Sequence, residues 1–318
     1  MSKSRDRARR IRLALAARRH KTRLARAFAA AVRKFARGQR KRVLAAFDEL
    51  DDAYFPTQQQ RVARPGGLAG LISLQSGLDS PARSQLTKAE PFPFVTITPA
   101  IFDESAEAIL ARKAFVKRLA TVADEGITNT INQLGRDSSA LGVFDPGVAD
   151  WLEHEKGTAY WRNEVNNGTV KALHGSLAEG MAAGETRRQL RKRVQETFSP
   201  LTGGGPVPAW RADRIALVET GGAYEHGGHL VGEEIEDAGF RIEKYWQATG
   251  DQLTRDPHRI AGSRNGWIAN TRRFALPAGA GLGSASAMYP ADPSITGDRG
   301  HIMGCRCTAV RREAKKKS

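Results

Sequence analysis

A strongly basic stretch with helical periodicity opens the chain, and it is the feature that most constrains the fold. Residues 1–42 hold 17 Lys or Arg and a single acid, Asp6. In the second half of this stretch and just beyond it, apolar residues recur at mostly three- and four-residue spacings, which predicts an amphipathic helix with arginine over its remaining surface. The apolar positions are Leu24, Phe28, Val32, Phe35, Val43 and Phe47. We therefore predict a basic amphipathic helical arm over residues 1–55, whose first twenty residues become ordered only on binding.

The basic charge lies at the two ends of the chain. Residues 311–318 carry five Lys or Arg against Glu313, whereas the residues between the two ends hold 28 basic and 32 acidic side chains. A mildly acidic body between basic ends predicts that the termini meet a polyanion. A solvated helix without a specific partner and an Arg-rich transit peptide are the alternatives. The predicted contacts to double-stranded DNA, without sequence preference, are Arg5, Arg7, Arg9, Arg10, Arg12, Arg18, Arg19, Lys21, Arg23, Arg26, Arg33, Lys34, Arg37, Arg40, Lys41, Arg42, Lys315, Lys316 and Lys317.

Length and composition exclude several classes of protein. A chain of 318 residues suggests two domains, or one domain with long appendages. It has no run of about 18 apolar residues, so no membrane-spanning helix is expected, and its N-terminus lacks the apolar segment of a secretory signal. Two cysteines make no disulfide framework, which favours a reducing compartment. No glycine-rich phosphate-binding loop occurs, so no nucleotide cofactor is predicted.

The pattern of elements predicts an α+β fold, with mainly helical N-terminal and middle regions before a small mixed C-terminal region of few short strands. Pro, Gly, Gln and Ser punctuate residues 56–100, which predicts a linker. Helical periodicity dominates residues 101–200, and a further helix is expected from Arg211 to about Thr220, where glycines loosen its later turns. Residues 240–249 have strand composition. The predicted C-terminal domain is 209–310, followed by a basic tail at 311–318.

One helix start carries a specific signal. Thr186 and Gln189 have the spacing of a capping box, in which each side chain bonds the other residue's backbone N–H. Leu190, Val194 and Phe198 then follow at four-residue intervals. We expect a capped helix with these three residues on one buried face.

The two cysteines lie close together near the C-terminus, in the sequence GHIMGCRCTAV. Two thiolates and two imidazoles, from Cys305, Cys307, His301 and His258, would satisfy a tetrahedral zinc ion. The Cys-x-Cys spacing is shorter than that of the usual zinc modules, and a disulfide across one residue would be strained. The interpretation we favour is therefore a pair of buried thiols on a strand, alternating with Arg306. Zinc is kept as the alternative, and no other cofactor is predicted.

Two further groups could carry metal chemistry. His226 and His229 lie three residues apart beside Glu225, a pattern more often found on a protein surface than in a metal site. A nuclease would use His258 as general base with Asp251 and Asp256 as Mg²⁺ ligands.

A His-Asn-His arrangement would instead recruit Asn265 or Asn270 together with His301. Against both forms of the nuclease hypothesis, a proline interrupts the turn before His258. We favour a polar turn in which Asp251 pairs with Arg255 and His258 joins the same network. We expect no enzymatic activity, and the metal-dependent nuclease remains the alternative function.

Six stretches from residue 144 onward form an ordered series: FDPGVADWLEHEKG, LHGSLAEGMAAGETRRQLRKRVQETF, RADRIALVETGGAY, YWQATGDQLTRDPHRIAG, MYPADPS and GCRC. The series resembles the phage Mu F-like head morphogenesis family, the minor head (minor capsid) proteins of tailed phages and prophages. The resemblance covers residues 144–310. Val218 stands where the family often has a polar residue. The signature positions here are Arg214, Glu219, Tyr224, Trp246, Asp251, Arg255, His258, Cys305, Arg306 and Cys307.

The resemblance implies a virion component of low copy number in the phage head. Its expected partners are the portal protein, the major capsid protein or both, and packaged double-stranded DNA, with no membrane. Its expected location is the head interior, and the host cytoplasm during assembly. This expectation agrees with the basic ends of the chain. A cytoplasmic nucleic-acid-binding protein unrelated to virions is a third reading of the same charge pattern.

Overall fold

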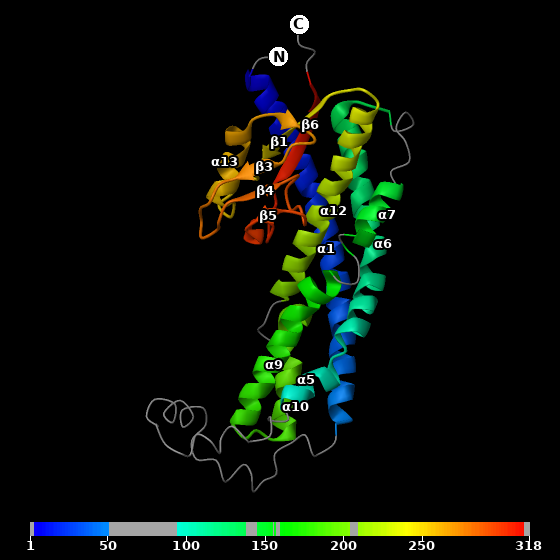
Figure 1. Ribbon diagram of the computed structural model, residues 1–318, viewed down its shortest axis with the longest axis vertical. Coiled ribbons are helices and arrows are strands. Elements are labelled where there is room, and N and C mark those ends of the chain that lie inside the picture. Colours follow the sequence, from blue (N-terminus) through cyan, green and yellow to red (C-terminus); the bar gives the residue numbers. More distant parts are fainter. Residues whose placement is uncertain are drawn as a thin grey trace. The chain divides into compact units, whose positions relative to one another are not determined.

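The computed structural model describes residues 3–50, 94–137, 145–154, 156, 160–203 and 209–314 (Figure 1). The chain forms two compact units. One unit contains Met1–Val32, Arg112–Gly157 and Trp210–Ser318, and the other contains Arg33–Ala111 and Thr158–Ala209. Both units are therefore built from segments that are distant in the sequence, and the predicted arm contributes residues to each of them.

The predicted amphipathic helix is present and is longer than its apolar pattern. Helix α1 spans Lys3–Asp48, so residues 3–20 are already helical. Phe28 and Val32 are buried in the first unit, and Val43 and Phe47 in the second. The helix begins well before the apolar pattern because alanine and arginine, both strong helix formers, dominate its early turns.

Helices α6 (Glu104–Leu134) and α12 (Trp210–Asp237) approach each other closely in the first unit. A Cβ atom on Gly126 would lie 2.0 Å from the carbonyl oxygen of Tyr224, and one on Gly227 would lie 2.1 Å from that of Ala123. The prediction that glycines loosen the helix after Thr220 is therefore wrong. They let two backbones touch, and packing offsets their low helix propensity.

The second unit is helical where the structure describes it. The predicted capping box is confirmed, because Thr186 and Gln189 bond reciprocally, and Leu190, Val194 and Phe198 are buried. Most of the predicted linker lies outside the described residues, but its end is helical and not extended. The helices are α5 (Phe94–Ile101), a π-helical turn (Trp161–Asn166), α9 (Asn167–Ala182), α10 (Arg187–Thr197) and α11 (Ser199–Thr202).

The C-terminal part of the first unit holds two small antiparallel sheets (Figure 1). Strands β2, β1 and β6 form one sheet, in which Trp246 pairs with Ala309, and β3, β4 and β5 form the other. This arrangement confirms the α+β class. Besides α1, α6 and α12, the described elements of the first unit are α7 (Asp145–His154), β1 (Ile242–Gln247), α13 (Asp256–Asn265), β2 (Ile268–Ala269), β3 (Phe274–Leu276), β4 (Ala285–Ala287), β5 (Thr296–Gly297), the 3-10 turn η4 (Arg299–His301) and β6 (Thr308–Glu313).

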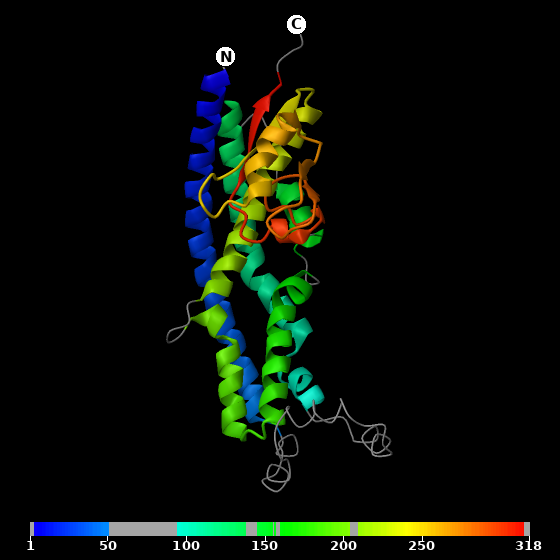
Figure 2. The same ribbon diagram turned by 90° about the vertical axis from the view of Figure 1, so that its left-hand side faces the viewer.

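The end of the chain differs from the predicted basic tail. Arg311, Arg312 and Glu313 belong to β6, and the side chain of Arg311 is buried. Lys315, Lys316 and Lys317 lie outside the described residues. Strand β6 (red) runs near the first half of α1 (blue) in both views of the ribbon (Figures 1 and 2). The start of β6 therefore lies beside the basic helix α1 and is not surrounded by solvent alone.

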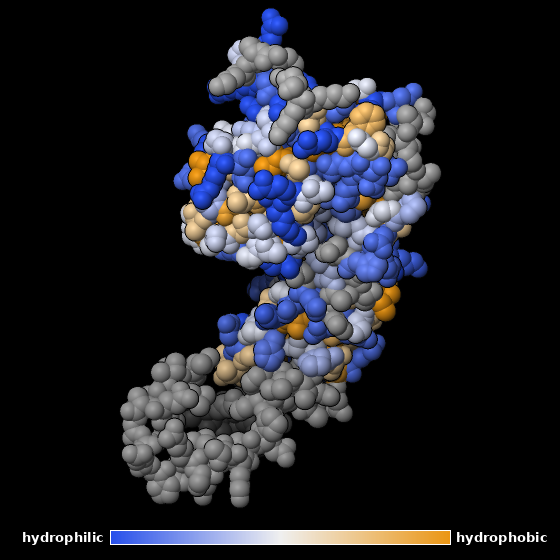
Figure 3. All heavy atoms as spheres, turned by 45° about the horizontal axis from the view of Figure 1, so that its top comes forward, coloured by the Kyte–Doolittle hydropathy of each residue, from blue (hydrophilic) through white to orange (hydrophobic). Residues whose placement is uncertain are grey.

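One face of the molecule can be compared by hydropathy. On the face drawn in Figure 3, hydrophilic residues predominate and hydrophobic ones form small separate areas. Among the described residues, none of the helices combines the length and the apolar character needed to cross a bilayer.

Candidate metal centre

His258 and the two cysteines come together from different elements. His258 lies in the first turn of α13, directly after Pro257. The cysteines lie in the segment between η4 and β6, so the expectation that they sit on a strand is corrected. Gly304, with φ +67°, makes the turn that admits this segment. All three side chains are at least 96% buried: relative exposure is 2% for His258, 4% for Cys305 and 3% for Cys307.

The distances fit a metal centre. The Nδ1 atom of His258 lies 3.7 Å from Sγ of Cys305 and 3.6 Å from Sγ of Cys307. The three candidate ligand atoms all lie within 4.8 Å of one another. In a tetrahedral zinc site, usual Zn–N and Zn–S bond lengths place a nitrogen and a sulfur ligand about 3.6 Å apart. One imidazole lone pair can accept only one S–H hydrogen bond well, whereas a metal ion accounts for both sulfurs at once.

His301 is not part of this ligand set, which corrects the predicted four-residue zinc site. Its Nε2 lies 2.8 Å from the carbonyl oxygen of Gly283 and must donate, because a carbonyl only accepts. Burial lowers the pKa of His301, which keeps its ring neutral. Its Nδ1 is therefore an acceptor, and Nε2–H of His258 donates to it over 3.2 Å. That donation leaves Nδ1 of His258 unprotonated and directed at the two sulfurs, as a metal ligand requires.

The thiols are electrostatically unequal. A hydrogen bond from Cys305 lowers the pKa of Cys307, whereas the same bond and burial raise the pKa of Cys305. Nitrogen and sulfur ligands favour zinc or another soft transition metal over Mg²⁺. The three ligands also line a small hollow with Thr249, Leu253 and Arg306. A zinc ion held here would have these three side chains as its protein ligands.

Surrounding contacts fix the three ligands. The Trp246 ring meets that of His258 edge-on, with ring centroids 5.3 Å apart. A Cβ atom on Gly262 would lie 2.2 Å from the carbonyl oxygen of Trp246, so only glycine lets α13 lie this close to β1. Arg255 donates to the carbonyl oxygens of His301 and Met303, which holds the turn before Cys305.

The predicted pair of Asp251 and Arg255 is absent. Asp251 lies 2.8 Å from Arg306 and 3.2 Å from Arg18, and it accepts a hydrogen bond from Thr254. Arg306, between the cysteines, thereby ties the segment that carries Cys305 and Cys307 to this acid. Of the three signature residues in this region, Asp251 and Arg306 pair with each other. Arg255 donates instead to backbone carbonyl oxygens.

The residues proposed for a nuclease do not gather around His258. Both its ring nitrogens are occupied, by the thiols and by His301, and Asp256 is exposed and next to Arg259. Asn265 joins α13 to β3 through Ala275, and Asn270 is fully buried beside His229. Within the described part of the chain, the metal-competent cluster contains no carboxylate.

The histidines of EHGGH are also placed differently from the predicted surface pair. His226 is packed against Trp151, with ring centroids 4.6 Å apart, and its Nδ1 lies 3.1 Å from the hydroxyl of Tyr289. Burial lowers the pKa of His226 to about 3. His229 instead faces Glu233, at 3.3 Å. Both rings pack against that of Tyr289, with ring centroids 5.8 Å and 5.5 Å apart, but their ring nitrogens have different polar partners.

The other signature residues lie on α12, apart from the metal centre. Glu219 forms a buried ion pair with Lys156, at 2.8 Å, and Tyr224 is buried beside the α6 glycine that it contacts. The guanidinium of Arg214 lies over the ring of Trp210. Glu219 and Tyr224 thus take part in the helical packing, whereas Arg214 is exposed and contacts a residue of its own helix. Neither a family model nor a curated protein nor a solved structure matches the chain.

The basic residues of α1 fall into two groups. Lys21, expected to contact DNA, is instead buried: its Nζ lies 2.7 Å from Glu225 and 2.5 Å from the carbonyl oxygen of Cys307. Arg9 and Arg18 also contact the protein, through Gln133 and Asp251. The sequence analysis named Glu225 only as a neighbour of His226 and His229 and did not predict its ion pair with Lys21. The exposed predicted residues on α1 are Arg5, Arg7, Arg12, Arg19, Arg23, Arg26, Lys34, Arg37, Lys41 and Arg42.

Proposed function

We propose that the chain is a minor head protein of a tailed phage or prophage, of the Mu F-like kind. Residues from separate stretches of the resembling series, Trp246, His258, Cys305 and Cys307, pack into one buried cluster. This convergence is the observation that carries the proposal, because a chance resemblance gives no reason for distant motifs to share one site.

The cluster holds a zinc ion that stabilises the C-terminal region around residues 209–310. Zinc matches the ligand types, the distances and the orientation of His258. It joins the start of α13 to the segment before β6, and such a link adds directly to folding free energy. Among the described residues, the metal-competent cluster around His258 contains no carboxylate to activate water, which favours a structural role for the metal over hydrolysis.

In this proposal the protein acts inside the head. It associates there with the portal or the major capsid protein, and with packaged double-stranded DNA through the exposed basic residues of α1. It reaches the head from the host cytoplasm during assembly. DNA contact without sequence preference requires only positive side chains that can reach phosphates.

The test is the protein content of purified, DNA-filled heads from the phage or prophage that encodes the chain. Mass spectrometry should find the chain in these heads at lower abundance than the major capsid protein. A Cys305→Ser variant should be incorporated poorly, and the surface variant His154→Ala normally. Heads that are complete, infectious and free of the chain would overturn the proposal.

A further inference from the structure

Six arginines of α1 repeat at a fixed interval. Arg5, Arg12, Arg19, Arg26, Arg33 and Arg40 are each seven residues apart. Seven residues of an α-helix make nearly two turns and rise about 10.5 Å, so successive members lie almost in line along one side. The first four are exposed and belong to the first unit, whereas Arg33 and Arg40 are half-buried. We call Arg5, Arg12, Arg19 and Arg26 the arginine row.

The arginine row lies on the side of the helix opposite its buried residues. Ala17, Lys21, Ala25 and Phe28 are buried on the other side. Within the described part of the chain, Arg12, Arg19 and Arg26 form no ion pair. Arg12, Arg19 and Arg26 therefore face solvent, whereas Lys21 on the opposite side of the helix is buried and paired with Glu225.

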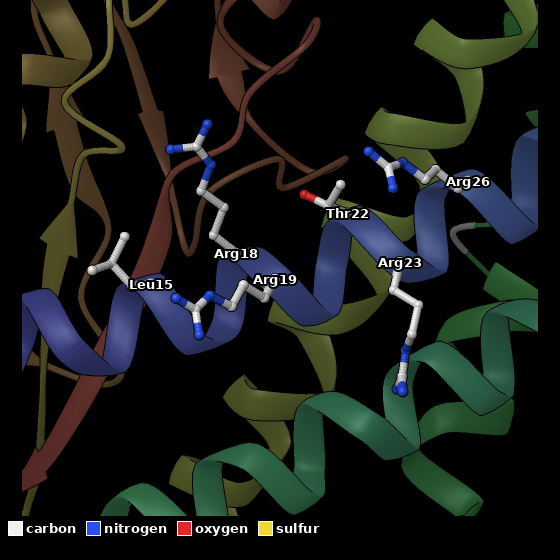
Figure 4. Close-up of a pocket in the computed structure, with 6 residues that line it drawn as sticks. All are labelled: Leu15, Arg18, Arg19, Thr22, Arg23 and Arg26. Atoms are coloured by element: carbon white, nitrogen blue, oxygen red, sulfur yellow. The ribbon is translucent and has the colours of Figure 1, made fainter.

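Arg19 and Arg26 also border a shallow hollow on the helix surface. Its lining residues, Leu15, Arg18, Arg19, Thr22, Arg23 and Arg26, all come from α1 (Figure 4). None of them is acidic, and the one acid in the first 42 residues, Asp6, lies 3.6 Å from Arg10. Two of the lining arginines are already paired with acids of other elements, Arg18 with Asp251 and Arg23 with Glu125. Among the described residues that line the hollow, Arg19 and Arg26 therefore offer the cations without an ion pair, next to the apolar side chain of Leu15.

We propose that the arginine row is a binding surface for the phosphate backbone of duplex DNA. This inference rests on the proposed function for the identity of the polyanion and specifies how it is bound. The row is straight, held by the rigid helix, and spans about 31 Å. That length corresponds to about nine base pairs of duplex, itself a stiff polymer with regularly spaced charge.

Two other polyanions fit the same surface less well. Single strands are usually held by aromatic side chains that stack on bases, but in the described α1 Phe28 and Phe47 are buried and Phe35 is half-buried. Anionic membranes bind helices that present a broad apolar face. The apolar face of α1 is buried in the protein, and Ile11 and Leu15 are its exposed large hydrophobic residues.

The experiment compares two triple variants of the full chain with equal loss of charge. One removes the row, R12Q/R19Q/R26Q, and the control removes exposed cations of α6, K113Q/K117Q/R118Q. Binding to two 30-base-pair duplexes of unrelated sequence is measured over a range of salt concentrations, and thermal melting verifies that each variant is folded. Vesicles of anionic lipid and a single strand of equal length are the competing ligands.

We expect the row variant to bind both duplexes more weakly and to lose about 2.7 from the magnitude of its log–log salt slope, or about 0.9 per phosphate contact. The control should keep most of the slope. Equal slopes in the two variants, or tighter binding of the wild type to vesicles or single strands, would overturn the inference. Head incorporation is scored separately, so a chain present in heads with unchanged slopes would refute the arginine row alone.

Discussion

Nδ1 of His301 accepts a hydrogen bond from Nε2 of His258 over 3.2 Å. Because His301 itself donates to the carbonyl oxygen of Gly283, the direction of both hydrogen bonds is fixed. On the other side of the His258 ring, Nδ1 is therefore available as a ligand atom and faces the sulfur atoms of Cys305 and Cys307. His301 is thus a positioning residue for a metal ligand.

Replacing His301 should weaken metal binding without removing a ligand. Loss of such a support typically costs 10–100-fold in metal affinity. We expect His301→Ala to bind one zinc per chain at saturation, with affinity in a chelator competition reduced by about that factor. His258→Ala should lose the zinc altogether. If the two variants lost zinc equally, His301 would be a ligand and the deduced order of hydrogen bonds would be wrong.

Purified wild-type protein should contain about one zinc per chain, measured by elemental analysis. Cys305→Ser and Cys307→Ser should each abolish it, whereas His154→Ala should retain it because that side chain is 73% exposed on α7. Chelation should lower the melting temperature of the wild type. Metal-free protein that melts at the same temperature with and without chelator would exclude a structural zinc.

The sequence predicted the parts of this fold that depend on local pattern. The amphipathic α1, the capping box at Thr186 and the strand around Trp246 each follow from residues a few positions apart. The continuation of α12 through its glycines did not follow, because its cause is contact with a helix about one hundred residues earlier. Local propensity cannot report such a contact.

The candidate site was predicted in composition and not in geometry. His258, Cys305 and Cys307 were recognised as possible zinc ligands, although the Cys-x-Cys spacing argued against a zinc site. His301 was named as a fourth ligand, whereas in the structure it accepts a hydrogen bond from His258. The hydrogen bond from Nε2 of His301 to the carbonyl oxygen of Gly283 determines the role of His301. Nothing in the sequence identifies Gly283 as its partner. Likewise Lys21 is indistinguishable in sequence from its basic neighbours, and only burial beside Glu225 separates it from them.

Gly262 is required for α13 to lie against β1. In Gly262→Ala the new Cβ would meet the carbonyl oxygen of Trp246 at 2.2 Å, a backbone atom that cannot rotate away. We expect a loss of about 1–3 kcal/mol in the free energy of unfolding, measured with denaturant, and weaker zinc binding. Gly175→Ala on α9 is the matched control. Nothing lies within 4 Å of its Cβ position, so it should stabilise by about 0.5–1 kcal/mol.

Removing only the lysine of the ion pair between Lys21 and Glu225 should lower the free energy of unfolding strongly. The two side chains are 7% and 1% exposed, so Lys21→Met leaves a carboxylate buried without its cation. We expect a loss of about 3–5 kcal/mol in the free energy of unfolding. Arg23→Met breaks a pair with Glu125 that is 65% and 35% exposed, and should cost less than about 1 kcal/mol. Glu225 also accepts hydrogen bonds from Thr308 and from the backbone N–H of Ala309. Similar losses in the two variants would show that these neutral donors suffice to stabilise the buried carboxylate.

His226 should make the protein less stable as the pH falls below neutral. Burial lowers its pKa from 6.5 to about 3. Between these values the unfolded chain binds a proton that the folded chain excludes, so the free energy of unfolding decreases as the pH decreases, by up to about 1.4 kcal/mol per pH unit. Above the unfolded pKa both states are neutral and this contribution is complete.

The measurement is the slope of unfolding free energy against pH from 7 to 4.5 for wild type and two glutamine variants. His226→Gln removes the titrating ring, so its slope should be shallower by about one proton, whatever its absolute stability. The control His154→Gln changes a ring that is 73% exposed and should leave the slope nearly as it is. Release of the proposed zinc ion would also contribute to the slope, but equally in all three proteins. A slope unchanged in His226→Gln would mean that the His226 ring binds its proton in the folded protein.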